Sequence, residues 1–215
     1  MGETPIVRFA FDPPGSADAL PRVCYPSYMF IRELQPADID RLREIDGAVE
    51  SMHYLHLEAG GEGLAASWKI SQRDFREKLI EPNVLSEDLL FLAKQVATGM
   101  DEGVALVSEY EDNLIGLLLA RIDNETRTLQ VADVRVDYDY RRQGMGLALG
   151  YRAITIAREM KFRAVFAESR TNNFPANQFL LKSGFELSGL DTKRYTNHDL
   201  VKEMATLLWY VEINE

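Results

Sequence analysis

Cysteine is almost absent from this sequence: Cys24 is the only one among 215 residues. A single cysteine forms no internal disulfide and builds no cysteine-ligated metal centre. Histidine is nearly as scarce, because His53 and His56 lie three residues apart and only the distant His198 remains. That spacing supplies no third ligand of the usual pattern. We therefore expect no metal site, and the shortage of cysteine suits a reducing cytoplasm.

Long hydrophobic runs and an excess of basic residues are also missing. The longest apolar stretch, residues 207–211, is far too short to span a bilayer, and no basic segment followed by an apolar core opens the chain. Acidic residues outnumber basic ones by 34 to 24, which gives a formal net charge of −10. This charge repels polyanions and favours cationic partners at long range. The sequence therefore predicts a soluble, cytoplasmic protein that binds neither membranes nor nucleic acid.

The composition that is present is typical of a globular protein, with 46% hydrophobic and 27% charged residues and no internal repeat. A chain of 215 residues is long enough for one well-buried domain. Prolines are concentrated near the N-terminus, at Pro13, Pro14, Pro21 and Pro26, where they argue against a packed element. We expect residues 1–27 to form an extended arm and residues 28–215 to form a single domain.

Hydrophobic periodicity predicts a mixed α/β or α+β domain. The expected strands cover residues 28–34, 105–107, 114–122, 128–136, 164–168, 185–187 and 207–213. The expected helices run from Pro36 through Val49, over residues 65–80, from the glycines near 144 to about 160, and from Asn173 to Lys182. The second of these helices depends on a shared buried face of Trp68, Ile70, Phe75 and Leu79. The three strands between residues 105 and 136 are expected to pair antiparallel.

The turn between the strand over 128–136 and the following helix is the most informative segment. It reads Arg-Arg-Gln-Gly-Met-Gly over residues 141–146 and follows a Val-x-Val strand end. The first N–H groups of a helix lack intrahelical partners and carry a partial positive charge, so they bind anions. Glycine lets the backbone approach a ligand closely, and arginine adds charge-assisted hydrogen bonds. The segment therefore predicts a phosphate site.

Two common nucleotide motifs do not fit this segment. No Gly-Lys-Ser/Thr follows, which excludes a P-loop, and Leu149 stands where a dinucleotide fingerprint has its third glycine, with Gly150 one residue late. The pattern Arg-x-x-Gly-x-Gly behind Val-x-Val instead resembles the acetyl-CoA motif of the GNAT superfamily of N-acetyltransferases. A second signature of that family is matched, at its own spacing, by Asn173, Ala176, Phe179, Gly184 and Phe185. Each of these five residues also has an ordinary structural role, so their combination carries the resemblance.

This resemblance implies the GNAT fold, a mixed and mostly antiparallel sheet of about six or seven strands flanked by helices. In that fold the fourth and fifth strands, here 128–136 and 164–168, splay apart and admit the pantetheine arm of acetyl-CoA. The resemblance also implies that the amide near Val136 holds the thioester oxygen as it becomes an oxyanion. It assigns acetyl-CoA contacts to Val134, Arg135, Val136, Arg141, Arg142, Gln143, Gly144, Met145, Gly146, Leu147 and Asn173.

For the catalytic base the resemblance indicates Asp133 and Glu168. The acceptor amine attacks only when it is neutral, whereas an alkyl ammonium has a pKa of about 10.4, so a base must remove a proton directly or through water. Other roles for these two residues stay open. Asp133 has Arg135 and Arg121 as potential ion-pair partners, Glu168 is able to end its strand in solvent, and both are able to bind the acceptor.

Leu180 departs from the family pattern, because it stands where the family usually has the tyrosine that protonates the departing thiolate. Leucine donates no proton, although a thiol with a pKa of about 8.5 leaves as the thiolate at neutral pH for only about 2 kcal/mol. Tyr195 is the candidate substitute, and packing on the last hairpin is its alternative role.

The C-terminal part is similar to the streptothricin acetyltransferases, over residues 191–197 and the aromatic strand at 207–210. We therefore expect an enzyme that moves an acetyl group from acetyl-CoA to a primary amine of a small, cationic molecule by direct attack. Two alternatives stay open. A peptide N-terminus or lysine is the acceptor if the Gly60 segment lies away from an open groove, and a noncatalytic acyl-CoA-binding module is the other reading. Exposed strands near the C-terminus are compatible with a homodimer.

Overall fold

The computed structural model describes residues 7–10 and 28–213. Its body is an eight-stranded sheet in the order β1-β2-β5-β6-β7-β8-β10-β9, in which every neighbouring pair is antiparallel except the parallel pair β7–β8. The strands of this sheet are β1 Val7–Ala10, β2 Tyr28–Glu33, β5 Gly103–Tyr110, β6 Asn113–Asp123, β7 Thr128–Val136, β8 Ala164–Arg170, β9 Glu186–Asp191 and β10 Thr206–Glu212. The predicted mixed, mostly antiparallel sheet is confirmed, with β1 added at its edge.

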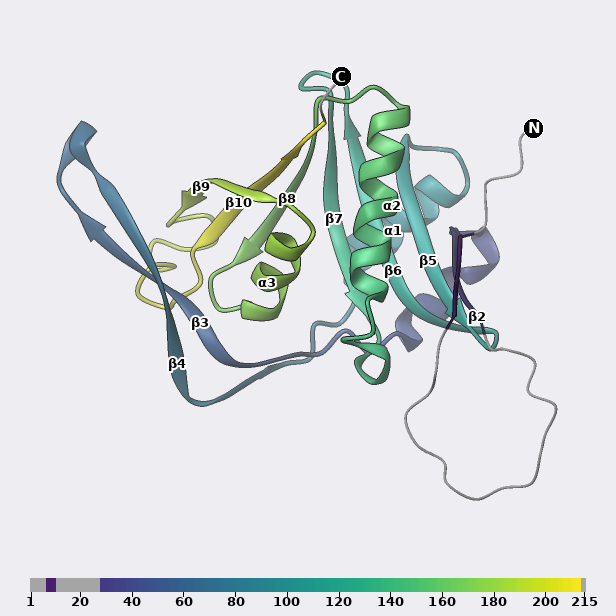
Figure 1. Ribbon diagram of the computed structural model, residues 1–215, viewed down its shortest axis with the longest axis horizontal. Helices are drawn as coiled ribbons and strands as arrows, with labels where there is room; N and C mark the ends of the chain where they lie inside the picture. Colours follow the sequence, from purple (N-terminus) through teal and green to yellow (C-terminus); the bar gives the residue numbers. More distant parts are fainter. Residues whose placement is uncertain (1–6, 11–27, 214–215) are drawn as a thin grey trace.

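Helices cover both faces of this sheet (Figure 1). The helical segments are η1 Pro36–Glu44, η2 Gly63–Ala65, α1 Glu87–Ala97, η3 Tyr138–Tyr140, α2 Met145–Glu159 and α3 Phe174–Lys182. Side chains alternate between the two faces of a strand. In β6, Leu118 and Ala120 therefore enter the core beneath α2, whereas Leu117 and Leu119 enter the core beneath η1 and α1. None of these helices within the described ranges is long and apolar enough to cross a membrane.

A long hairpin forms a separate two-stranded sheet, and it overturns the helix predicted over residues 65–80. Its strands are β3 Val49–Gly60 and β4 Ser67–Glu81, paired from the Val49–Glu81 end to the Gly60–Ser67 end. The local sequence is rich in helix formers, but β3 pairs with β4 on both sides of a register shift that leaves residues 75–78 without a partner, and this tertiary pairing overrides local propensity. Figure 1 shows the hairpin as an arm that leaves the body, and all residues from 58 to 69 are exposed.

Two further elements differ from the expected order. The helix predicted from Pro36 through Val49 is shorter, because η1 ends at Glu44 in 3₁₀ geometry and Val49 already belongs to β3. Helix α1 was not predicted, although Ser86 caps it by accepting the N–H of Leu89. The remaining predicted helices and strands are present. Most of the predicted N-terminal arm, including Cys24 and its prolines, lies outside the described residues.

Candidate active site

Strands β7 and β8 separate partway along their length, as predicted. Their parallel pairing extends only from Thr128–Ala164 to Val131–Ala167. Beyond that point β7 continues to residue 136 and β8 to residue 170 without pairing to each other. The register of β7 against β6 also shifts there, so that Ala132 has no partner and forms a bulge. We call β7 residues 132–136 and β8 residues 168–170 the fork.

The main chain of β7 presents donors to this fork. The N–H of Asp137 donates to the carbonyl oxygen of Ile115 in β6 at 2.8 Å. Because hydrogen-bonded and non-hydrogen-bonded pairs alternate along an antiparallel ladder, the N–H groups of Val134 and Val136 point away from β6 and toward β8. This is the direction required of the predicted oxyanion donor at Val136.

The N-terminus of α2 carries no cap of its own. Gly144 is its N-cap residue, with a φ of 88°, no side-chain cap and no acidic residue in the first turn. The first intrahelical bond is donated by the N–H of Ala148 to the carbonyl of Gly144 at 3.0 Å. The other two α-helices differ, since Ser86 caps α1 and Asn173 caps α3. The predicted phosphate site therefore coincides with an uncapped helix start, whose first N–H groups are able to bind an anion.

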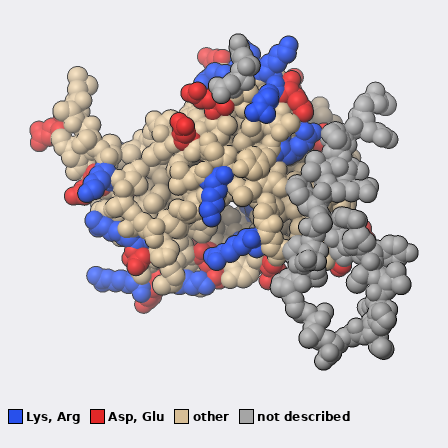
Figure 2. Space-filling view, in the orientation of Figure 1, with Lys and Arg blue, Asp and Glu red and all other residues tan. Residues whose placement is uncertain are grey.

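Two glycines bring this helix start close to the fork. A Cβ on Gly146 would lie 3.7 Å from Cγ2 of Val136 and 3.6 Å from the ring of Phe179, and one on Gly150 would lie 3.4 Å from Phe179 Cζ. Helix α2 thus packs tightly on both β7 and α3. The two halves of the predicted cofactor site, the amides 143–147 and the fork, consequently adjoin. Figure 2 shows basic side chains in the centre of this view, where the surrounding surface is mostly uncharged, whereas most other charged side chains lie near the edges.

The two arginines of the motif have different surroundings. Arg142 is exposed and adopts a φ of 62°. In Arg141, by contrast, each guanidinium nitrogen donates to a backbone carbonyl: Nε to Val136 at 2.8 Å, Nη2 to Asp46 at 2.9 Å and Nη1 to Ala48. The Arg141 side chain is thus engaged by protein, whereas the Arg142 side chain is exposed to solvent.

Asp133 forms an ion pair with Arg135, one of the two partners that the sequence offered. Its carboxylate accepts from Arg135 Nε at 2.6 Å and Nη2 at 3.0 Å. The Arg135 side chain is 2% exposed, and its Nη1 also donates to the carbonyl of Asn83 at 3.1 Å. Asp133 therefore neutralises a buried cation on the α1 side of β7. Its carboxylate, which was expected as a candidate base, is engaged by this ion pair.

Glu168 is the more accessible of the two predicted bases. It lies on β8 at the fork, and both carboxylate oxygens accept from Arg194 Nη2 at 3.1 Å. Tyr195 follows Arg194 in the chain and is 60% exposed, with its N–H held by Asp199. Leu180 is buried and lines a small apolar void with Phe179 and other core residues. An acid at the position of Leu180 is therefore absent, and Tyr195 is adjacent in the chain to Arg194, which contacts Glu168.

Asn177 is a buried polar residue that sequence reasoning missed. Its Oδ1 accepts from Ser169 Oγ at 2.6 Å, and its Nδ2 donates to the carbonyls of Arg170 at 2.9 Å and Asn173 at 2.8 Å. Ser169 Oγ also accepts from Trp209 Nε1 at 2.7 Å. This network fixes the end of β8 against the start of α3. A lone asparagine on an apolar helix face was the available signal.

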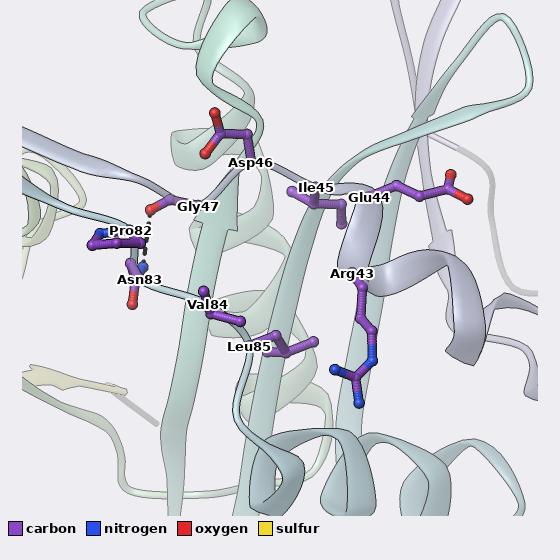
Figure 3. A pocket seen from close by; sticks show the side chains of 9 residues that line it. All are labelled: Arg43, Glu44, Ile45, Asp46, Gly47, Pro82, Asn83, Val84 and Leu85. Atoms are coloured by element: carbon purple, nitrogen blue, oxygen red, sulfur yellow. Dashed lines mark hydrogen bonds between the residues drawn. The ribbon is translucent and has the colours of Figure 1, made fainter.

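A cavity of about 440 Å³ lies on the α1 side of the sheet, between the chain segments that enter and leave the hairpin (Figure 3). We call it the hairpin-base cavity. It is lined by Arg43, Glu44, Ile45, Asp46, Gly47, Pro82, Asn83, Val84 and Leu85. The guanidinium of Arg135 lies behind its wall, 2.9 Å from the position of a Cβ on Gly47. The sequence contained no motif for this cavity, because its lining comes from two segments about 40 residues apart.

Carboxylates surround the base of the hairpin. Glu81 pairs with Arg170 at 2.5 Å, and Glu50 accepts from Lys78 and, at 2.9 Å, from the hydroxyl of Tyr138. The Lys78 contact and then the Tyr138 contact hold the pKa of Glu50 below its ordinary value. Ion pairs therefore already engage these carboxylates, and an incoming cation would compete with the basic side chains that hold them.

His53 and His56 lie on the hairpin strand β3. His53 Nδ1 is 2.6 Å from Asp74, and His56 Nδ1 is 2.8 Å from Glu203. Within residues 7–10 and 28–213, no group of three or more His, Cys, Asp or Glu side chains is arranged to hold a metal ion.

This arrangement of a forked sheet, an uncapped helix and a glycine-bearing turn agrees with a comparison of the sequence with known families. The acetyltransferase (GNAT) family matches residues 64–185. The chain therefore belongs to this family, whose acetyl donor is acetyl-CoA.

Particular relatives refine this assignment. The chain is 34% identical to streptothricin acetyltransferase A of Bacillus subtilis (strain 168) over 111 residues, which are 51% of this chain and 63% of that relative. A structure described as a streptothricin acetyltransferase of Bacillus anthracis str. Ames, in complex with acetyl coenzyme A, superimposes with a TM-score of 0.69 at 20% identity, covering 86% of this chain and 98% of the other. Nourseothricin acetyltransferase also gives a TM-score of 0.69, at 23% identity, covering 86% and 99%. These structures establish the shared fold.

Proposed function

We propose that this chain transfers an acetyl group from acetyl-CoA to a primary amine of a small, cationic molecule, by direct attack and without an acyl-enzyme. The observation that carries the proposal is the uncapped start of α2 lying against the fork into which the N–H groups of Val134 and Val136 point. The amides from Gln143 to Leu147 and the side chain of Arg142 would hold the diphosphate. The thioester would then reach the fork.

In this proposal the residues of the fork perform the proton and charge work. The amine nitrogen forms a bond to the thioester carbonyl carbon, and the N–H of Val136 stabilises the oxygen as its negative charge develops; a donor of this kind contributes about 3 kcal/mol. Glu168 accepts the proton from the ammonium, directly or through water. Since Leu180 donates no proton, the sulfur departs as a thiolate or is protonated by Tyr195.

The acceptor class is supported by position and by similarity. Glu44 and Asp46 line the hairpin-base cavity, so a cation approaching from this side meets carboxylates. Glu81 and Glu50 lie beside it on the hairpin and are held by Arg170 and Lys78, which such a cation would have to displace. The relative with 34% identity is named for streptothricin. Against this, the hairpin tip at Gly60 lies away from the body (Figure 1), which was the sign expected for a peptide acceptor. A peptide N-terminus or lysine is therefore the second candidate.

Thiol release on mixing with acetyl-CoA and a panel of amines tests the proposal. The panel contains streptothricin, a linear polyamine and a set of peptides, and mass spectrometry identifies the acetylated product. Acetylation of a small cationic amine supports the proposal, and acetylation of peptides alone selects the second candidate. Binding of acetyl-CoA with no thiol released from any amine would indicate a noncatalytic module, which is compatible with the loss of the tyrosine at Leu180.

The role of Glu168 is tested by Glu168→Gln, which preserves shape and removes the base. If Glu168 accepts the proton, kcat falls by about 10²- to 10⁴-fold, and raising the pH partly restores it because more acceptor is already neutral. Arg194→Gln is the matched control, since it removes the partner of Glu168 and leaves the carboxylate in place. A Glu168→Gln variant with a raised acceptor KM and an unchanged kcat would instead assign Glu168 to acceptor binding.

A further inference from the structure

We propose that Arg141 is a positioning residue that ties the cofactor-binding turn to the wall of the hairpin-base cavity, and that it does not bind phosphate. The inference rests on the proposed function, in which the turn holds the diphosphate of acetyl-CoA and the cationic acceptor approaches from the side of the hairpin-base cavity. It concerns the turn over residues 137–144, which precedes α2, and the segment over residues 45–50, which lines the cavity and leads into β3.

The geometry of Arg141 joins three pieces of main chain. The carbonyl of Val136 belongs to the end of β7, and the carbonyls of Asp46 and Ala48 belong to the cavity segment. A guanidinium presents its donors in a rigid planar fork, so three simultaneous bonds fix the relative positions of these peptides. The guanidinium carbon also lies 5.3 Å from the centroid of the Tyr138 ring, which restricts its movement further.

Burial makes this arrangement costly to abandon. Arg141 is partly buried, and the loss of hydration lowers the pKa of its guanidinium from the ordinary value. Arginine nevertheless stays charged in proteins, so its charge must be met by hydrogen-bond acceptors. The three carbonyls meet it. Turning the side chain toward a diphosphate would leave all three of these oxygens without their arginine donor.

Further contacts join the same two segments. Asp137 Oδ2 accepts the N–H of Asp46 at 2.9 Å, and the hydroxyl of Tyr138 donates to Glu50 at 2.9 Å. Each contact runs from the turn 137–141 to residues 46–50. The turn that opens the diphosphate site and the segment that walls the cavity are therefore held as one unit, with Arg141 at its centre. Loss of Arg141 would free the Val136 peptide and the cavity wall together.

Three variants separate this role from phosphate binding. Arg141→Gln should raise the acceptor KM and lower kcat, each by about tenfold or more, because it removes bonds to three carbonyls and the loss of even one hydrogen bond to a charged group has an effect of about tenfold. It should change the acetyl-CoA Kd by less than about threefold, within what the loss of one weak contact produces. Arg142→Gln should show the opposite pattern, with a weaker acetyl-CoA Kd and an unchanged acceptor KM. Arg158→Gln, exposed at the far end of α2, controls for the loss of one positive charge.

Hydrogen–deuterium exchange gives a readout that needs no activity. Faster exchange at residues 46–50 is expected in Arg141→Gln and not in Arg142→Gln. Arg141→Lys keeps the charge and fewer of the donors, so an intermediate rate is expected if the glutamine variant folds poorly. The proposal is wrong if Arg141→Gln weakens acetyl-CoA binding as much as Arg142→Gln does, or if exchange at 46–50 stays unchanged. A failure of the proposed function would appear differently, as a wild-type protein that binds no acetyl-CoA or releases no thiol.

Discussion

Replacing Gly144 by alanine should weaken acetyl-CoA binding without creating any clash. Gly144 has a φ of 88°, and a Cβ built on it meets nothing within 4 Å. The cost is therefore conformational: holding a residue with a Cβ in the left-handed region costs about 1–2 kcal/mol. The free protein can release part of this strain by rotating the peptides on either side of residue 144. Those peptides carry N–H groups that face the diphosphate, so binding must restore the strained geometry.

The strain divides between two measurable quantities. Any part that persists in the free protein lowers the melting temperature, by about 2–4 °C for each kcal/mol in a chain of this size. Any part that the free protein releases raises the Kd for acetyl-CoA, by tenfold for each 1.4 kcal/mol. Full release would thus raise the Kd by about 5- to 30-fold. Calorimetric titration with acetyl-CoA and thermal unfolding of the free protein together measure both parts.

Gly184 supplies a closely matched control. It has a φ of 87°, and a Cβ there also meets nothing within 4 Å, but it follows α3. Gly184→Ala should lower the melting temperature comparably and leave acetyl-CoA binding intact. The reasoning is refuted if Gly144→Ala binds acetyl-CoA as tightly as the wild type while losing no stability, or if Gly184→Ala weakens binding to the same extent.

Two further predictions concern stability. Gly150→Ala should be tolerated, or should stabilise the protein by up to about 1 kcal/mol, because alanine favours the helix and its Cβ fits at 3.4 Å from Phe179. Gly150→Val should cost about 1–3 kcal/mol because its larger side chain overpacks the same contact. Chemical denaturation measures both changes in the free energy of unfolding. Asp38 accepts from Arg32, and this contact is the main cause that lowers its pKa below the ordinary 3.8. Its stabilising effect is therefore complete above about pH 4 and is lost as the pH falls through the lowered pKa. The free energy of unfolding of the wild type should exceed that of Asp38→Asn at neutral pH, and this difference should shrink in acid. A difference that stays constant with pH would contradict this.

The C-terminal half of the fold could be predicted from the sequence because local sequence signals and tertiary structure agree there. The glycine of the turn, the Asn173 cap and the stop at Gly184 each mark a boundary that the structure confirms. Strands β5 and β6 are continuous apolar runs that are buried on both faces, and such runs indicate strands by their length and flanking turns. The direction of the Val136 amide also follows from pairing with β6, which the predicted strand order already contained.

The hairpin was missed for a physical reason. Most residues of β4 are exposed, so burial imposes no clear period, and Trp68, Ile70, Phe75 and Leu79 fit a helix as well as a strand. Pairing with β3 decides the outcome, and local sequence does not report such pairing. Helix α1 was a different kind of omission, since Ser86 followed by Glu87 is a recognisable helix start. The hairpin-base cavity could not be predicted, because it exists only once the two hairpin legs are placed together.

The unpaired residue Ala132 decides what the rest of β7 displays. In an uninterrupted strand, residues three apart face opposite ways, yet Val131 and Val134 both pack toward the core beneath α2. The bulge therefore shifts the alternation of side chains by one residue between the part of β7 that pairs with β8 and the part that does not. A chain without Ala132 would have nearly the same hydrophobicity, but the side chains of one part of β7 would face the opposite side of the sheet. The bulge, more than the identity of any side chain, therefore determines which side chains and main-chain groups of β7 face β8 and which face the core.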